Sequence, residues 1–160
     1  MATELFVVAH EYGHHIALHK IDDGADLKEQ ELEADHLAAL ITAHVGAELR
    51  LQFAHGGQAG VIALLGTDIV RRARSVLTTG REEPFSSDTH PPLHQRLLML
   101  DTLRYDPREA DAVRAGRQHL IEIMEGLWEL ILPDLQRMYA RGIRPMPMKE
   151  ADTQWLPFWG

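Results

Sequence analysis

The residues with the clearest capacity for chemistry are His10, Glu11 and His14, which stand together in the segment His-Glu-Tyr-Gly-His. On a helix, a step of four residues places two side chains on the same face, one turn apart. Two imidazoles in this position can chelate one zinc ion, and the glutamate after the first histidine can take a proton from a water that the metal activates. We therefore predict His10 and His14 as metal ligands and Glu11 as the catalytic base. The alternative is a histidine-rich, exposed helix face that binds no metal.

A third ligand is predicted in a neighbouring segment, because a catalytic zinc needs three protein ligands and an open position. Glu31 begins the segment Glu-Leu-Glu-Ala-Asp, at a distance that suits an antiparallel neighbouring helix. We predict Glu31 as this ligand, and Asp35, four residues later on the same face, as the acceptor for the free ring N–H of a ligating histidine. The alternative is that the acidic residues of this helix start are solvated and only complement the helix dipole, as we expect for Glu33. His36 is expected to be a surface or packing histidine.

A further group of residues is Thr-His-Pro-Pro at positions 89–92, followed by Arg96. A histidine held rigidly at a helix start could donate a hydrogen bond to the oxyanion of a tetrahedral intermediate. His90 is the candidate for this role. The alternative is a simple helix start with proline in its first positions.

Taken together, these three segments resemble one family, the zinc metallopeptidases that include the CAAX prenyl proteases, the bacterial heat-shock protease HtpX and the mitochondrial protease Oma. The matching pieces are Val-Val-Ala-His-Glu-Tyr-Gly-His at 7–14, Glu-Leu-Glu-Ala-Asp at 31–35, and Thr-His-Pro-Pro at 89–92 with Arg96. Their order and approximate spacing also agree. The resemblance covers about residues 3–100, and we find no match for the region after residue 103.

The resemblance implies a gluzincin-type fold and a zinc metalloendopeptidase. It assigns these roles at the matching positions: zinc ligands His10, His14 and Glu31, general base Glu11, transition-state stabilisation by His90, and support of the site by Asp35 and Arg96. Family members usually have transmembrane helices and upstream strands whose edge binds the substrate by strand addition. Because nine residues precede His10 here, the upstream sheet is expected to be missing. This leaves a metal-binding pseudo-peptidase or interaction module as the alternative function.

Composition narrows the possible partners and metal ligands. The net charge is -8 and the basic residues are scattered, which argues against nucleic acid or an anionic membrane surface as the main partner. The resemblance implies a peptide or protein substrate. The chain contains no cysteine, so nitrogen and oxygen atoms must hold any metal. Its apolar stretches fall short of the ~20 residues of a transmembrane helix, and no secretory signal is visible. We expect a cytoplasmic protein that associates with membranes only through a missing part or a partner.

Apolar residues recur at steps of three and four along most of the chain, which predicts helices and no clear strand. The predicted helices cover about residues 5–18, 26–45, 59–77, 91–103 and 108–131. With 160 residues, the chain is expected to form a mainly α, single-domain protein. Residues 1–105 would form the metallopeptidase core, and residues 106–160 a helical extension with a Trp- and Pro-containing tail packed on the same domain.

Several residues predict where these helices begin and end. Asp26 with Glu29 resembles a capping box, Gly46 and Gly80 are expected stops, Pro91 and Pro92 suit a first turn, and Pro133 should interrupt the last helix before a short continuation to residue 140. The predicted buried stripe of the first helix is Leu5, Val8, Ala9, Tyr12 and Ile16. The candidate buried positions of the last helix are Ala112, Leu120, Ile121, Ile123, Met124, Leu127 and Leu130.

Overall fold

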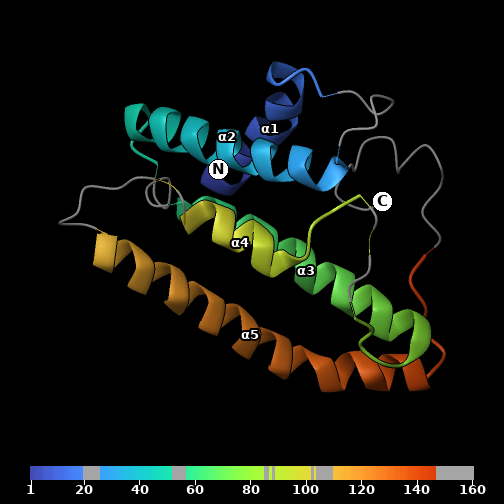
Figure 1. Ribbon diagram of the computed structural model, residues 1–160. Coiled ribbons are helices and arrows are strands. Elements are labelled where there is room, and N and C mark those ends of the chain that lie inside the picture. The colour runs from blue at the N-terminus through green and yellow to red at the C-terminus, as the bar shows by residue number, and fades with distance from the viewer. Residues whose placement is uncertain are drawn as a thin grey trace. The chain divides into compact units, whose positions relative to one another are not determined.

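The computed structural model describes residues 1–19, 26–51, 57–84, 87, 89–101, 103 and 110–146. These residues contain no strand and form the helices α1 (Ala2–Ile16), α2 (Leu27–Glu48), α3 (Gln58–Thr79), α4 (Leu93–Asp101) and α5 (Ala110–Ala140) (Figure 1). The prediction of a mainly α protein is therefore confirmed. None of the described helices is long and apolar enough to cross a membrane. The predicted aromatic tail, with its tryptophans at 155 and 159, lies outside the described residues.

The chain divides into two compact units. The first comprises Met1–Leu65 with Phe85–Ile123, and the second comprises Gly66–Pro84 with Met124–Gly160. All the residues predicted to act in the site belong to the first unit. The predicted division of the chain at residue 105 into a core and an extension stays a prediction.

In the first unit, α1 and α2 pack closely because small residues line the contact between them. Gly13 lies against α2 so tightly that an added Cβ would be 3.2 Å from both the Cα and the carbonyl oxygen of Ala34. Ala34 and Ala38 are completely buried. The close approach brings the side chains of positions 10 and 14 on α1 within reach of those of positions 31 and 35 on α2.

The start of α3, the whole of α4 and the first part of α5 complete the packing of the first unit. A Cβ on Gly60 would lie 2.6 Å from Phe6 and 3.1 Å from Leu100, so this glycine lets α3 approach both α1 and α4. The buried Arg117 on α5 donates to the carbonyl oxygen of Leu100 at 2.8 Å. Helix α4, which carries Arg96, is thereby fixed from two sides.

The buried face of α1 differs from the predicted one. It consists of Ala2, Phe6, Ala9, His10 and Gly13. Of the predicted stripe, Ala9 is buried and Leu5 is partly buried, but Val8, Tyr12 and Ile16 expose 66, 57 and 49% of their surface. The prediction failed because it ranked positions by hydrophobicity, whereas α2 packs on small residues and on His10, which meets polar partners there.

The boundaries of α2 and α3 follow the predicted signals in part. Asp26 caps α2 by accepting a hydrogen bond from the backbone N–H of Lys28 at 2.9 Å, as its residue type indicates. Gly46 does not end the helix, which continues to Glu48 and closes on Arg50 with a positive φ of 52°. Gly80, with φ of 84°, follows the last residue of α3, so this predicted stop is confirmed.

Two predictions about prolines are wrong. Pro91 and Pro92 precede α4 rather than forming its first turn, and the carbonyl of Pro92 accepts the first helical hydrogen bond, from the N–H of Arg96 at 3.3 Å. Pro133 lies inside α5 without interrupting it. Its ring removes the hydrogen bond to the carbonyl of Glu129, but both residues are exposed, so water can satisfy that carbonyl.

The predicted buried positions of α5 are also largely wrong. Ala112, Ile123, Leu127 and Leu130 are exposed, while Leu120, Ile121 and Met124 are partly buried. Among the described α5 residues of the second unit, Trp128 is buried; it donates to Glu82 at 3.0 Å and lies under the guanidinium of Arg72, 4.3 Å from the ring centroid. Pairing with charged groups, which apolar periodicity does not register, thus decides which face of this helix is buried.

Candidate metal centre

Three predicted ligands from two helices meet in the first unit. One donor atom each from His10, His14 and Glu31 lies within 4.8 Å of the others. The two Nε2 atoms are 3.2 Å apart, and the carboxylate of Glu31 lies 3.5 Å from His10 Nε2 and 3.3 Å from His14 Nε2. The helical step of four places the imidazoles side by side, and the close packing of α2 supplies the carboxylate.

The chemistry of this cluster fits a metal cation. Two imidazole nitrogens and one carboxylate oxygen form a donor set that zinc accepts in catalytic sites. The Oε2 atom of Glu31 is buried and makes no hydrogen bond with the described residues; its nearest charged contacts are His10 Nε2 at 3.5 Å and Arg96 at 3.7 Å. A cation between the three side chains would compensate this oxygen and both Nε2 lone pairs at once.

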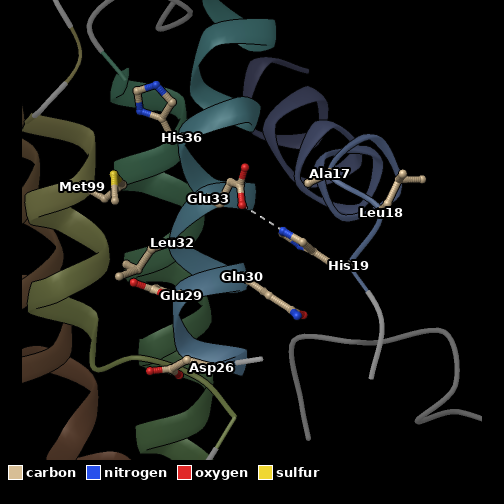
Figure 2. A pocket seen from close by; sticks show the side chains of 10 residues that line it. All are labelled: Ala17, Leu18, His19, Asp26, Glu29, Gln30, Leu32, Glu33, His36 and Met99. Atoms are coloured by element: carbon tan, nitrogen blue, oxygen red, sulfur yellow. Dashed lines mark hydrogen bonds and ion pairs between the residues drawn. The ribbon is translucent and has the colours of Figure 1, made fainter. Parts of the chain in front are cut away.

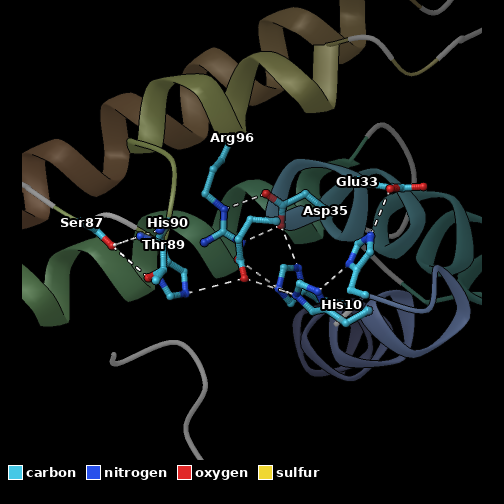
Figure 3. Close-up of polar contacts among 10 residues, drawn as sticks. His10, Glu33, Asp35, Ser87, Thr89, His90 and Arg96 are labelled. Carbon is cyan, nitrogen blue, oxygen red and sulfur yellow. Dashed lines mark hydrogen bonds and ion pairs between the residues drawn. The ribbon is translucent and has the colours of Figure 1, made fainter. Parts of the chain in front are cut away.

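Behind the first ligand lies a buried chain of charged groups. Nδ1 of His10 is 3.0 Å from Oδ1 of Asp35, which is completely buried. Arg96 donates two hydrogen bonds of 2.7 Å to the two oxygens of Asp35 (Figure 3). Asp35 is thus held in place to accept the His10 ring N–H, which leaves Nε2 of that ring as the atom that faces the cluster.

Neighbouring charges shift the pKa values of His10 and Glu31 in the metal-free cluster. Burial alone would lower the pKa of His10, but the hydrogen bonds and charges of Asp35 and Glu31 outweigh it and raise this pKa to about 9. For Glu31, burial alone would raise the pKa, but His10, His14 and Arg96 lower it well below its usual range. A positive charge, whether a proton or a metal ion, is therefore favoured at the centre of the cluster.

His90 lies at the edge of this cluster, with Nε2 3.8 Å from Oε1 of Glu31. Two neighbouring hydroxyls fix its ring. Ser87 Oγ accepts hydrogen bonds from the backbone N–H groups of Thr89 and His90, at 3.2 and 3.0 Å. Because these two bonds use both lone pairs of the oxygen, the Ser87 hydroxyl donates its own proton to Thr89 Oγ1, 3.2 Å away. Thr89 then donates to Nδ1 of His90 at 2.7 Å (Figure 3). In this arrangement the ring proton sits on Nε2, as a hydrogen-bond donor that faces the cluster.

Glu11 is exposed on α1, and the described residues form no hydrogen bond or ion pair with it. On a helix, it is rotated by about 100° from His10 and about 60° from His14. It therefore lies beside the ligand face and keeps a carboxylate that is not engaged by another described group. The structure places it as the sequence predicted, on the same helix as the two histidines.

Two residues near His14 were missed by the sequence prediction. Nδ1 of His14 lies 2.9 Å from Nδ1 of His19, and Nε2 of His19 lies 3.1 Å from Oε2 of Glu33. Glu33 is solvated as expected, with a side chain that is 61% exposed, but it also bonds to a histidine that is only 9% exposed. His36 is partly buried, in line with a packing role.

The position of His19 depends on the turn that ends α1. Leu18 adopts a positive φ of 56°, and the N–H groups of Leu18 and His19 bond to the carbonyls of His15 and His14. This is the six-to-one and five-to-two pattern of a Schellman turn, in which the left-handed residue is usually glycine. Leucine there costs about 1 kcal/mol or more, and no residue pattern in the sequence announces it.

Beside this turn, between the end of α1 and the first turns of α2, lies a groove of about 740 Å³ (Figure 2). Its wall includes His19 and three carboxylates, those of Asp26, Glu29 and Glu33. The groove is linked to the cluster through His19, which lines the groove and contacts His14.

Comparisons with protein-family models, with curated proteins and with solved structures found no match to this chain. The interpretation of the site therefore depends on its geometry. The structure brings together, from three separate segments, the predicted residues His10, His14, Glu31, Asp35, His90 and Arg96. Glu11 lies on the same helix as the two histidines.

Proposed function

We propose that this protein is a zinc-dependent metalloendopeptidase. The observation that carries the proposal is the convergence of His10, His14 and Glu31, whose donor atoms lie within 4.8 Å of one another. The buried Oε2 of Glu31, which makes no hydrogen bond with the described residues and has only the longer contacts to His10 and Arg96, supports it, because a carboxylate oxygen in this state suits a metal ligand. The resemblance of three segments to the CAAX prenyl protease, HtpX and Oma group adds the reaction type.

A zinc ion held by these residues would polarise the scissile carbonyl and lower the pKa of a water molecule, so that this water can lose a proton and attack the carbonyl. Glu11 would take a proton from the attacking water and later give it to the leaving amine. Nε2–H of His90 would donate to the developing oxyanion, a role that needs a donor held in place before the reaction. Asp35 and Arg96 would keep the His10 ring in its ligand orientation.

A second candidate function is a metal-binding interaction module without efficient proteolysis. The observation that favours it is the exposure of Val8, Tyr12 and Ile16 on the outer side of α1. Apolar side chains at this spacing lie along one face of the helix that carries the metal ligands, and such exposed stripes often mark contact surfaces.

The metal content of the purified protein tests both functions. We expect one zinc per chain by elemental mass spectrometry, lost in His14→Ala and in Glu31→Ala. His15→Ala is the matched control, because His15 is an exposed histidine of the same helix, and it should keep its zinc. A wild-type protein without zinc after reconstitution would contradict both proposals.

Glu11→Gln separates the two functions. The amide removes the base but leaves the ligands, so a peptidase should keep its zinc and lose about 10²–10⁴-fold in turnover of a casein or peptide substrate. A binding module should show no turnover in either protein. Wild-type turnover that Glu11→Gln leaves unchanged would contradict the role of Glu11.

A further inference from the structure

The second ligand histidine has a support that the proposed function does not use. Nδ1 of His14 faces Nδ1 of His19 at 2.9 Å, and the other nitrogen of His19 faces a carboxylate oxygen of Glu33 at 3.1 Å. Figure 2 shows the contact between His19 and Glu33 at the wall of the groove. Three side chains from the end of α1 and from α2 thus form one line of hydrogen bonds.

The direction of these hydrogen bonds follows from the ligand role of His14. When Nε2 of a neutral imidazole binds a metal, its proton must sit on Nδ1. Nδ1–H of His14 then donates to Nδ1 of His19, which requires the proton of His19 to be on Nε2. That N–H in turn donates to Glu33, so every donor in the line has an acceptor.

The fold holds this line in place. The Schellman turn after α1 reverses the chain direction, so that the backbone N–H of His19 donates to the carbonyl of His14 at 3.0 Å. The ring centroids of the two histidines are then 5.1 Å apart. It does so with leucine, not glycine, in the left-handed position, at Leu18. The side chain of His19 is only 9% exposed, so its hydrogen bond with His14 is largely shielded from water, whereas its bond with Glu33 lies at the wall of the groove.

We propose that His19 and Glu33 are positioning residues that fix the ring orientation and tautomer of His14. The proposal rests on the proposed function, because it concerns the metal centre of that function. Each ligand histidine would then have a carboxylate behind it: Asp35 directly behind His10, and Glu33 behind His14 through the ring of His19. Ligand histidines that lose such a support typically bind their metal 10–100-fold more weakly.

The affinity for zinc, measured by competition with a chromogenic chelator, tests the proposal. We expect His19→Phe to weaken zinc binding about tenfold or more, and Glu33→Gln to weaken it less, because an amide oxygen can still accept from His19. His19→Gln, whose side-chain oxygen can accept from His14, should retain more affinity than His19→Phe. The matched controls are His15→Phe and Glu29→Gln, which alter exposed residues of the same two helices and should bind zinc like the wild type.

A double variant distinguishes a line of hydrogen bonds from two separate effects. Because Glu33 acts on His14 only through His19, adding Glu33→Gln to His19→Phe should weaken zinc binding no further. Nitrogen-15 NMR of the zinc-loaded wild type should show the proton of His19 on Nε2. Additive losses, or a proton of His19 on Nδ1, would overturn the proposal.

The outcomes separate this inference from the proposed function. A wild-type chain that binds no zinc overturns the proposed function and this inference with it. A wild-type chain that binds zinc, with equal affinity in His19→Phe, overturns the positioning role alone. If His19→Phe does not fold by circular dichroism, Glu33→Gln and the NMR measurement still decide the matter, because neither changes the packing of the His19 ring.

Discussion

Arg96 holds Asp35 through two hydrogen bonds of 2.7 Å, across 61 positions of the chain and almost out of contact with water. This pair joins α4 to α2 directly behind the candidate metal centre. Since Asp35 also lies 3.0 Å from the His10 ring, one buried carboxylate connects the packing of α4 with the orientation of a ligand. Stability and metal binding should therefore both depend on it.

Replacing only the arginine should be costly. Arg96→Met leaves the carboxylate of Asp35 buried without its main partner, which should reduce the free energy of unfolding by roughly 3–5 kcal/mol. The double variant Asp35→Leu with Arg96→Met removes both charges and should be more stable than Arg96→Met alone. Urea unfolding of the metal-free proteins measures both changes. A double variant less stable than the single one would show that the pair contributes net stability that apolar packing cannot replace.

Gly13 should be required for the close approach of α1 and α2. In Gly13→Ala the new Cβ would meet the backbone of Ala34 at 3.2 Å, so the helices must shift, at a cost of about 1–3 kcal/mol of stability, and the ligands on both helices must shift with them. We expect weaker zinc binding in the same chelator competition. Gly126→Ala is the control, because its added Cβ would have no atom of another described segment within 4 Å; there the substitution should stabilise the protein by roughly 0.5–1 kcal/mol. Unchanged zinc affinity in Gly13→Ala would contradict this view of the helix contact.

The proximity of His10, His14 and Glu31 could be predicted from the sequence because it depends largely on helix geometry. A step of four residues on a helix fixes the relation of His10 to His14, and the same step fixes that of Glu31 to Asp35. A short connection between two helices then leaves few ways to pack them. The predictions about which residues approach one another in the first unit were accordingly better than those about which faces are buried.

What could not be predicted depends on contacts between distant residues or on rare backbone conformations. Val8 and Tyr12 look like core residues, but the glycine and alanines of the contact determine which face of α1 is buried. His19 reaches His14 only because Leu18 adopts a left-handed conformation that leucine seldom takes. The tautomer of His90 depends on two hydroxyls whose hydrogen bonds are not visible in a pattern of residue types.

The hydroxyl of Thr89 should control the donor role of His90. In Thr89→Val the ring loses the donor to Nδ1, so the proton is free to move to that nitrogen and the Nε2–H donor is partly lost. We expect His90→Ala to reduce kcat about 10²–10³-fold, Thr89→Val to reduce it less, and Thr89→Ser to restore it, with KM nearly constant in all three. Steady-state kinetics on a peptide substrate and the nitrogen-15 shifts of His90 provide the measurement. Equal kcat in Thr89→Val and the wild type would contradict the proposed arrangement of protons.

The stability of the metal-free protein should fall as the pH rises from about 6.5 to about 9. Although burial opposes the protonated form, the hydrogen bonds and charges of Asp35 and Glu31 raise the pKa of His10 from 6.5 to about 9, so the folded state binds this proton more tightly than the unfolded state does. The resulting stabilisation is fully present below pH 6.5 and is lost as the pH passes through 9, with a change of up to about 3 kcal/mol. The lowered pKa of Glu31 expresses the same ion pair, and its free energy is counted once.

Thermal unfolding in the presence of a chelator, at intervals from pH 6 to pH 9.5, measures this change. His10→Gln cannot carry the proton, so its Tm should vary much less over the same range. With zinc in excess, the trend should reverse, since the metal competes with the proton for His10 and binds better as the pH rises. A metal-free wild type whose Tm is constant from pH 6 to pH 9.5 would show that the buried carboxylates do not hold a proton on His10.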